Sequence, residues 1–261
     1  MARCLMCGGA SASTEVDGVP VCRACFERFP TCSMCGRRTP RTWVMRDRPE
    51  RKYCDRCKTG EACDFCGHPA AGALKDGRGI CAPCRSQLVP SFKLAFALFE
   101  KVRLAVSAHG GITVKSDLDF SIVTPHDMAA KVGKVYSPTH ALEKRPIGLF
   151  VRSGNSRTIY CESLLPKATL ITTCAHELGH AWQSEYCDRP VVPLLAEGLS
   201  EWIAHRIAMR AKLVEEARRI ELRTDVYGEG FRVVNNLVRK VGMEQMLKTV
   251  KDRLIRGVAA L

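Results

Sequence analysis

Two histidines and a glutamate in the segment C-A-H-E-L-G-H-A-W have the types and the spacing of a metal site. His176 and His180 are four residues apart, so on a helix both imidazoles project from one face and can bind one metal ion. Glu177 lies beside them and can accept a proton from water that the metal activates. The pattern H-E-x-x-H is weak by itself, because a plain helix with two core or surface histidines also matches it.

A third ligand follows on the next predicted helix, in the block A-E-G-L-S-E-W. Catalytic zinc sites hold three protein ligands and leave the fourth position to water. Glu197 comes 17 residues after His180 and completes a His-His-Glu set. Glu201 and His205 follow at steps of four residues, so they share a helical face with Glu197. We expect Glu201 or His205 to orient a ligand, with a solvated charged stripe as the alternative.

These residue types together predict hydrolysis of a peptide bond. Zinc in such a site lowers the pKa of water and polarises the scissile carbonyl, while Glu177 takes the proton and delivers it to the leaving amine. The oxyanion that develops needs a donor besides the metal. Tyr227, in D-V-Y-G-E-G-F-R, and His205 are the candidates, and a tyrosine that merely packs is the alternative for Tyr227.

A second kind of metal site precedes the first, because most of the 15 cysteines form six C-x-x-C pairs. The pairs repeat as three modules of four cysteines: Cys4, Cys7, Cys22 and Cys25; Cys32, Cys35, Cys54 and Cys57; Cys63, Cys66, Cys81 and Cys84. Modules one and three share a gap of 14 residues, which favours sequential over cross-braced pairing. Four thiolates suit tetrahedral zinc, with disulfide or redox cysteines as the alternative. The sequence therefore predicts three structural zinc ions and one catalytic zinc ion.

Local signals in the modules specify their backbone. Each first C-x-x-C pair is followed by glycine, as a tight knuckle with positive φ requires. The Asp-Gly pairs at 17–18 and 76–77 predict hairpin turns before the second pair of cysteines. Three later cysteines are unpaired in sequence: Cys161, Cys174 and Cys187. Cys174 is expected to be a small buried filler, because helical spacing turns it off the face of the two histidines.

The elements that must position the catalytic residues follow from apolar periodicity and capping signals. Helices are predicted at 91–109, from Pro125, and at 166–185, 193–217, 230–241 and 243–254. Strands are predicted at 120–123, 147–152 and 158–164. The expected fold is α+β, with three small Cys4 zinc-ribbon or LIM-like modules at 1–30, 31–60 and 61–89. A mostly helical domain with a small β-sheet is expected at 90–261.

Composition limits the partners and the compartment. No apolar run approaches the roughly 20 residues of a membrane span, so no membrane association is expected. The N-terminus, M-A-R-C-L-M-C, lacks a secretion signal, so we expect a cytoplasmic protein whose reduced thiols serve metals. The net charge of +13 permits nucleic acid as a partner, but the basic residues are scattered, and a generally basic surface is the simpler interpretation.

Five sequence blocks carry a resemblance to known peptidases. H-E-L-G-H-A-W followed by A-E-G-L-S-E-W resembles the gluzincin metallopeptidases, in which a Glu-Gly on the following helix provides the third ligand. The order of C-D-F-C-G-H…L-K-D-G-R-G-I-C-A-P-C, L-A-F-A-L-F-E-K-V, A-H-E-L-G-H-A-W, A-E-G-L-S-E-W-I-A-H and V-Y-G-E-G-F-R is similar to the plant "DA" family of ubiquitin-activated LIM peptidases. The resemblance covers roughly residues 60 to 250.

The resemblance implies a gluzincin-like zinc endopeptidase that cleaves protein substrates, with LIM-type modules in front that bind substrate or a protein regulator. In that family the regulator is ubiquitin. This chain shows no ubiquitin-interacting helix ahead of its modules, and its first two modules lack the spacing and the histidine ligand of a regular LIM domain, so ubiquitin activation is not carried over.

Two other functions stay open from the sequence. One is a DNA-associated metalloprotease that degrades DNA-bound proteins and uses the basic modules as its anchor. The other is a non-enzymatic zinc scaffold for protein interactions. The intact Glu177 argues against the scaffold, because a retired site has no need for a carboxylate base beside its ligands.

Overall fold

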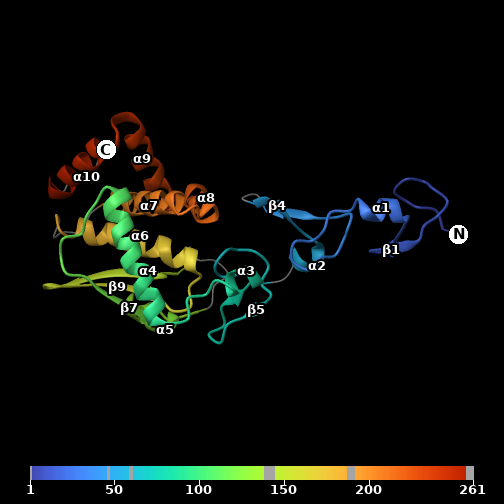
Figure 1. Cartoon of the computed structure of the whole chain (residues 1–261), viewed down its shortest axis with the longest axis horizontal. Helices are drawn as coiled ribbons and strands as arrows, with labels where there is room; N and C mark the ends of the chain where they lie inside the picture. The colour runs from blue at the N-terminus through green and yellow to red at the C-terminus, as the bar shows by residue number, and fades with distance from the viewer. Residues whose placement is uncertain (1, 46–47, 59–60, 138–144, 187–191, 257–261) are drawn as a thin grey trace.

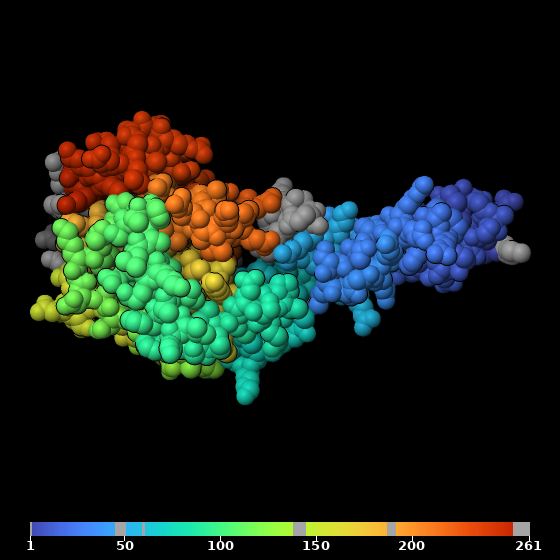
Figure 2. Space-filling view, viewed as in Figure 1, coloured from blue at the N-terminus to red at the C-terminus, as the bar shows by residue number. Residues whose placement is uncertain are grey.

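The computed structural model describes residues 2–45, 48–58, 61–137, 145–186 and 192–256, so Cys187 lies outside the described residues. The helical body lies at one end of the molecule, and the cysteine modules lead away from it as a narrow arm that ends at the N-terminus (Figure 1). The space-filling view shows the third module seated against the body, with the first two farther out (Figure 2).

Each cysteine module consists of a two-stranded antiparallel hairpin followed by a short helix. The elements are β1 Thr14–Val16, β2 Val19–Val21 and α1 Arg23–Glu27; β3 Trp43–Met45, β4 Arg48–Tyr53 and α2 Asp55–Lys58; β5 Gly72–Ala73, β6 Gly79–Ile80 and α3 Ala82–Arg85. The knuckle glycines Gly8, Gly36 and Gly67 have φ of 74°, 71° and 71°, as the sequence predicts. Asp17 and Gly18 both have positive φ, which is the hairpin turn expected there.

The body contains helices and one small sheet. Its elements are α4 Phe92–Ala105, the π-helical turn η1 Val106–Gly110, β7 Asp119–Val123, α5 Pro125–Lys131, β8 Gly148–Ser153, β9 Ser156–Glu162, α6 Lys167–Gln183, α7 Pro193–Arg210, α8 Val214–Leu222, α9 Val226–Val241 and α10 Met243–Arg256. Thr124 caps α5 by accepting a hydrogen bond from the Asp127 N–H at 3.1 Å, as its position before proline predicts. None of the helices in the described ranges has both the length and the apolar character that crossing a bilayer requires.

The sheet and the helices form successive layers (Figure 1). The strand order is β7-β9-β8, with β7 parallel and β8 antiparallel to the central β9. Helix α6 packs on β8 and β9 with one face and on α7 with the other, and α7 packs in turn on α9. The outer edge of β8 pairs with no other strand among the described residues. Mixed helix and strand with small sheets are as predicted, whereas the gluzincin-like assignment of the body remains a prediction.

One predicted helix is wrong, because residues 193–217 form two helices and not one. The chain turns at Lys212, whose φ of 57° is left-handed, and the Leu213 N–H donates to the Ala208 carbonyl at 2.8 Å. The break lets α8 bury Ala217 and Ile220. No glycine or proline marks this turn, so the usual stop signals do not reveal it.

The third module is attached to the body by a buried ionic cluster. Arg78 is fully buried, and its guanidinium donates to Asp76 at 2.7 Å, to Glu162 at 3.2 Å and to the Ser163 carbonyl at 3.0 Å. Arg145 also binds this oxygen of Glu162. The hydrophobic core of this module is continuous with that of the body, whereas the first two modules have small cores of their own.

Candidate metal centre

Three ligand atoms from two helices meet at one point. The Nε2 atoms of His176 and His180 are 3.0 Å apart, and Glu197 Oε2 lies 3.2 and 3.3 Å from them. Ligand atoms about 2.1 Å from a tetrahedral zinc ion lie about 3.4 Å from one another, so the triangle has nearly the edge lengths of such a site. Glu197 Oε2 is buried without a well-directed hydrogen-bond donor among the described residues. The three side chains therefore fit a metal ion.

Close helix packing brings Glu197 to the histidines. A Cβ added at Gly179 would lie 2.6 Å from Ser200 Oγ, so α6 and α7 approach at a distance that only glycine allows. A Cβ at Gly198 would lie 2.5 Å from the backbone of Gly230 on α9. The glycine of the A-E-G-L block thus has a packing role next to the ligand.

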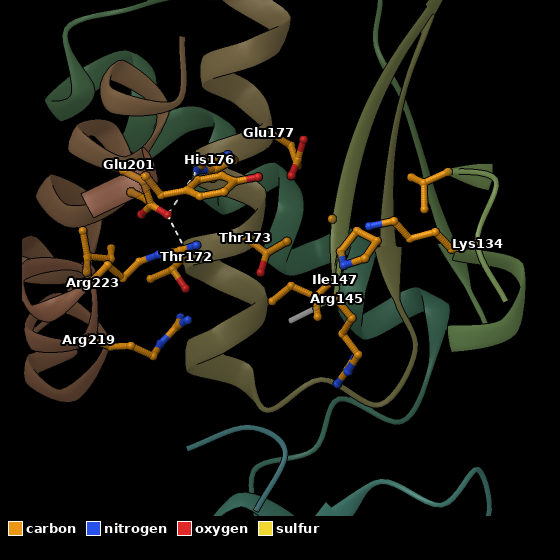
Figure 3. Close-up of a pocket in the computed structure, with 16 residues that line it drawn as sticks. Lys134, Arg145, Ile147, Thr172, Thr173, His176, Glu177, Glu201, Arg219 and Arg223 are labelled. Carbon is orange, nitrogen blue, oxygen red and sulfur yellow. Dashed lines mark hydrogen bonds and ion pairs between the residues drawn. The ribbon is translucent and has the colours of Figure 1, made fainter. Parts of the chain in front are cut away.

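Side chains of α7 lie next to the Nδ1 atoms of both imidazoles. The Nδ1 atom of His180 lies 3.4 Å from Ser200 Oγ, which also accepts a hydrogen bond from Gln183 at 3.2 Å. Nδ1 of His176 lies 3.8 Å from Glu201, and Glu201 accepts a hydrogen bond from Arg223 at 2.9 Å (Figure 3). Partners of this kind orient metal-binding imidazoles through the nitrogen that the metal does not use.

Glu177 is buried on α6 and projects toward the strands, on the side away from Glu201 (Figure 3). Its carboxylate accepts a hydrogen bond from the backbone N–H of Phe150 on β8. A Cβ at Gly148 would lie 2.6 Å from Glu177 Oε1, so glycine makes room for the carboxylate. Burial raises the pKa of Glu177, and the two neighbouring histidines oppose this shift. The carboxylate therefore lies beside the ligand triangle and out of bulk solvent.

The ionisable groups of the site shift one another's pKa values. Burial lowers the pKa of His176, but the carboxylates of Glu197, Glu201 and Glu177 outweigh it and raise the value to about 9. Burial also acts to raise the pKa of Glu197, but the two imidazoles overcome it and hold that pKa far below its usual range. Three carboxylates around two imidazoles concentrate negative potential where the ligand atoms meet, and a bound cation would satisfy it.

The two candidates for an oxyanion donor lie in different places, one at the metal site and one away from it. Tyr227 lies at the site, with its ring centroid 5.9 Å from that of His176, and it lines the same pocket. Burial, followed by the charge of Glu197, raises the pKa of Tyr227 to about 12. His205 lies elsewhere: it binds Glu221 at 2.8 Å and borders a different hollow beside Trp202. The structure does not bring His205 to the metal ligands.

Sequence analysis missed several residues of this site. Ser200, Gln183 and Arg223 lie around the ligands, and the sequence analysis assigned a role to none of them, although Ser200 belongs to the block A-E-G-L-S-E-W. Ser200 could have been found, because it lies three residues after Glu197 and so on the same face of α7. Arg223 carries no such signal, since its role depends on how α8 folds back onto α7.

The cysteines gather into three groups of four in chain order, and four ligand atoms of each group lie within 4.8 Å of one another. Sulfur atoms of neighbouring pairs are 3.8 Å apart in modules one and two and 3.5 Å apart in module three. A tetrahedral zinc–thiolate site has sulfur atoms about 3.8 Å apart. All described cysteines are free thiols, so each group could hold a metal ion.

Cys174 is fully buried, as the sequence predicts, and its sulfur lies 3.9 Å from that of Cys161. The pair lies between α6 and the central strand of the sheet, away from the twelve cysteines of the modules. Its place in the hydrophobic core fits a packing role.

Comparison with protein-family models, with curated proteins and with solved structures found no match for this chain. The resemblance to the plant "DA" peptidases therefore remains a hypothesis that rests on the five sequence blocks. The function has to be inferred from the chemistry of the site.

Proposed function

We propose that the chain is a zinc-dependent peptidase that hydrolyses peptide bonds in protein substrates. The observation that carries this proposal is the triangle of His176, His180 and Glu197 atoms, with the Glu177 carboxylate on α6 between the two histidines. Zinc held there would supply Lewis acidity, which activates water and polarises a carbonyl. The donor set and its spacing fit zinc, and the buried Glu197 oxygen supports a cation at this point.

Residues of the chain itself supply the other catalytic roles. Glu177 accepts the proton of the attacking water and passes it to the leaving amine. Tyr227 stays protonated because of its raised pKa, so its hydroxyl can donate a hydrogen bond to the developing oxyanion. The partners Ser200 and Glu201 keep the imidazoles in place while charge develops.

Strand β8 offers a place for the substrate backbone. The carbonyl of Ile147, just before β8, accepts a hydrogen bond from the Glu162 N–H in β9. The Phe150 N–H points away from β9 toward Glu177, so backbone groups of alternate residues of β8 face the site. An extended peptide can add to such an edge through main-chain hydrogen bonds, which are blind to sequence. This geometry favours a peptide over a small molecule as the substrate.

The resemblance supports the same chemistry and adds roles for the modules. We propose that the body is gluzincin-like and that the zinc modules position a protein substrate or bind a protein regulator. The first module lies farthest from the body (Figure 2), and the second touches the body where Arg51 pairs with Glu215 at 3.3 Å. The first module therefore remains accessible to a partner.

Selective metal removal tests the proposed function. A chelator of moderate affinity should remove the zinc ion at His176, His180 and Glu197, and abolish hydrolysis, before it removes zinc from the cysteine modules. Three ligands and an open position hold zinc less tightly than four thiolates do. We expect mass spectrometry to show loss of one zinc ion from the full chain, together with loss of cleavage of a denatured protein substrate. Added zinc should restore both. Hydrolysis that persists after the zinc ion at His176, His180 and Glu197 has been removed would mean that another centre carries the activity.

A further inference from the structure

The second cysteine module carries the positive charge of the arm. Residues 31–60 contain nine Lys and Arg against three Asp and Glu, a net charge of +6. Residues 1–30 and 61–89 each contain three of either sign, a net charge of zero. A zinc ion with four thiolates would add about −2 to every module alike. With metal bound, the second module therefore stays positive while both of its neighbours become negative.

Much of this charge has no carboxylate to neutralise it. Arg37 forms an exposed pair with Asp17 at 3.4 Å. Arg51 pairs with Glu215 of the body at 3.3 Å. Four other cations of the module form no ion pair with a carboxylate among the residues that the structure describes, and all but the first are exposed: Arg38, Arg41, Lys52 and Lys58. Exposed cations without partners on their own chain attract a polyanion from solution.

An exposed tryptophan lies among these cations. Trp43 on β3 is 48% exposed, whereas the other two tryptophans of the chain, Trp182 and Trp202, are buried. The Nζ atom of Lys58 lies 3.1 Å from the centroid of the Trp43 ring, and the indole N–H donates to Asp55. Because Lys58 covers one face of the ring, the exposed half of the side chain belongs largely to the other face and the edge. The ring is thus held at the surface where a flat partner can stack on it.

The hairpin of β3 and β4 presents the ring and the charges together, in the middle of the arm (Figure 2). Val44 pairs with Lys52 in the register of the two strands, and both side chains are exposed. Successive side chains of a strand alternate between its faces, so Trp43 and Lys52 lie on opposite faces of a thin hairpin. A flexible polyanion can contact both faces of such a hairpin, whereas a rigid duplex reaches one.

We propose that the second cysteine module binds single-stranded nucleic acid, with Trp43 as the stacking platform and the cations around it as phosphate contacts. A single strand supplies both complementary chemistries at once, a chain of negative charges and unpaired bases with flat faces. A duplex offers the same charge but keeps its base faces stacked inside. The inference does not depend on the proposed peptidase, because none of these residues belongs to the candidate metal centre at His176, His180 and Glu197.

The test measures binding of labelled oligonucleotides to the full, zinc-loaded chain by fluorescence anisotropy. Oligo-dT and oligo-U of equal length represent DNA and RNA, the two sources of a single strand, and a DNA duplex is the comparison. We expect both single strands to bind more tightly than the duplex, since phosphate charge and base stacking are common to them. Four phosphate contacts predict a slope of about −3 for the logarithm of the binding constant against that of the salt concentration, at about −0.7 per contact. Stacking should also quench the fluorescence of Trp43.

Four variants locate the site. Trp43→Ala should weaken binding by about 5- to 100-fold, the usual effect of removing an aromatic ring from a stacked base, and should abolish the quenching. Trp43→Phe keeps a ring and should keep most of the affinity. Lys52→Gln, at an exposed position, should make the salt slope shallower by about 0.7. Lys75→Gln is the matched control, because it removes an equal exposed charge from the third module, and it should bind like the wild type.

Equal affinity for duplex and single strand would overturn the inference, and so would undiminished binding by Trp43→Ala. Polyglutamate of the same charge that competes as well as the oligonucleotide would identify a site for polyanions in general and overturn it too. Native mass spectrometry checks that Trp43→Ala keeps the zinc ion of its module. If it does not, Lys52→Gln decides, and a salt slope equal to that of the wild type contradicts the inference. Binding of only one of the two single strands upholds it and identifies the source.

Discussion

Replacement of Glu177 by Gln is expected to lower kcat for peptide hydrolysis by about 10²- to 10⁴-fold, the usual contribution of a general base. Gln has nearly the same shape but cannot take a proton. Glu177 is not one of the three atoms that form the ligand triangle, so the metal should stay. The carboxamide oxygen can still accept the hydrogen bond from the Phe150 N–H, so the local fold should also remain.

The measurement compares initial rates of peptide cleavage and zinc content for the wild type and Glu177→Gln. Glu221→Gln is a matched control, because that carboxylate lies on α8 and binds His205 outside the metal site. The control should cleave at close to the wild-type rate. Undiminished cleavage by Glu177→Gln with four zinc ions bound would show that the base is another group.

Replacement of Arg78 by Met is expected to lower the free energy of unfolding by about 3–5 kcal/mol, the usual effect of breaking a buried ion pair. Arg78 is fully buried between Asp76 and Glu162. Its loss leaves Asp76 without its guanidinium partner and Glu162 with Arg145 alone. Because the same side chain joins the third module to the body, docking of the module should weaken as well.

Chemical denaturation followed by the fluorescence of the buried Trp182 and Trp202 measures this loss. Arg103→Met is the control, since Arg103 forms an exposed pair with Glu100 at 2.8 Å, and such pairs contribute about 1 kcal/mol or less. A loss no larger for Arg78→Met than for Arg103→Met would mean that the cluster does not hold the module.

The features that the sequence predicts correctly are determined by residues only a few positions apart in the chain. The knuckle glycine Gly8 and the turn at Asp17 and Gly18 are set by backbone geometry within a few residues. The spacing of His176 and His180 places both on one helical face wherever that helix packs. For these residues type and spacing carry most of the information.

The features it missed depend on packing between distant segments. Arg78 meets Glu162 across 84 positions of sequence, and no local pattern links them. His205 lies on the same helical stripe as Glu197. The turn at Lys212 folds α8 back, however, so that the His205 imidazole pairs with Glu221 and not with the metal ligands. A helical period specifies which side chains share a face but not what that face contacts.

The zinc content of the full chain and of His176→Ala, counted by native mass spectrometry, decides whether His176, His180 and Glu197 hold a metal ion. We expect four zinc ions per wild-type chain, three in the cysteine modules and one at His176, His180 and Glu197. We expect three ions in His176→Ala, with the hydrolytic activity lost. Three ions in both chains would contradict the catalytic metal site, and with it the proposed function.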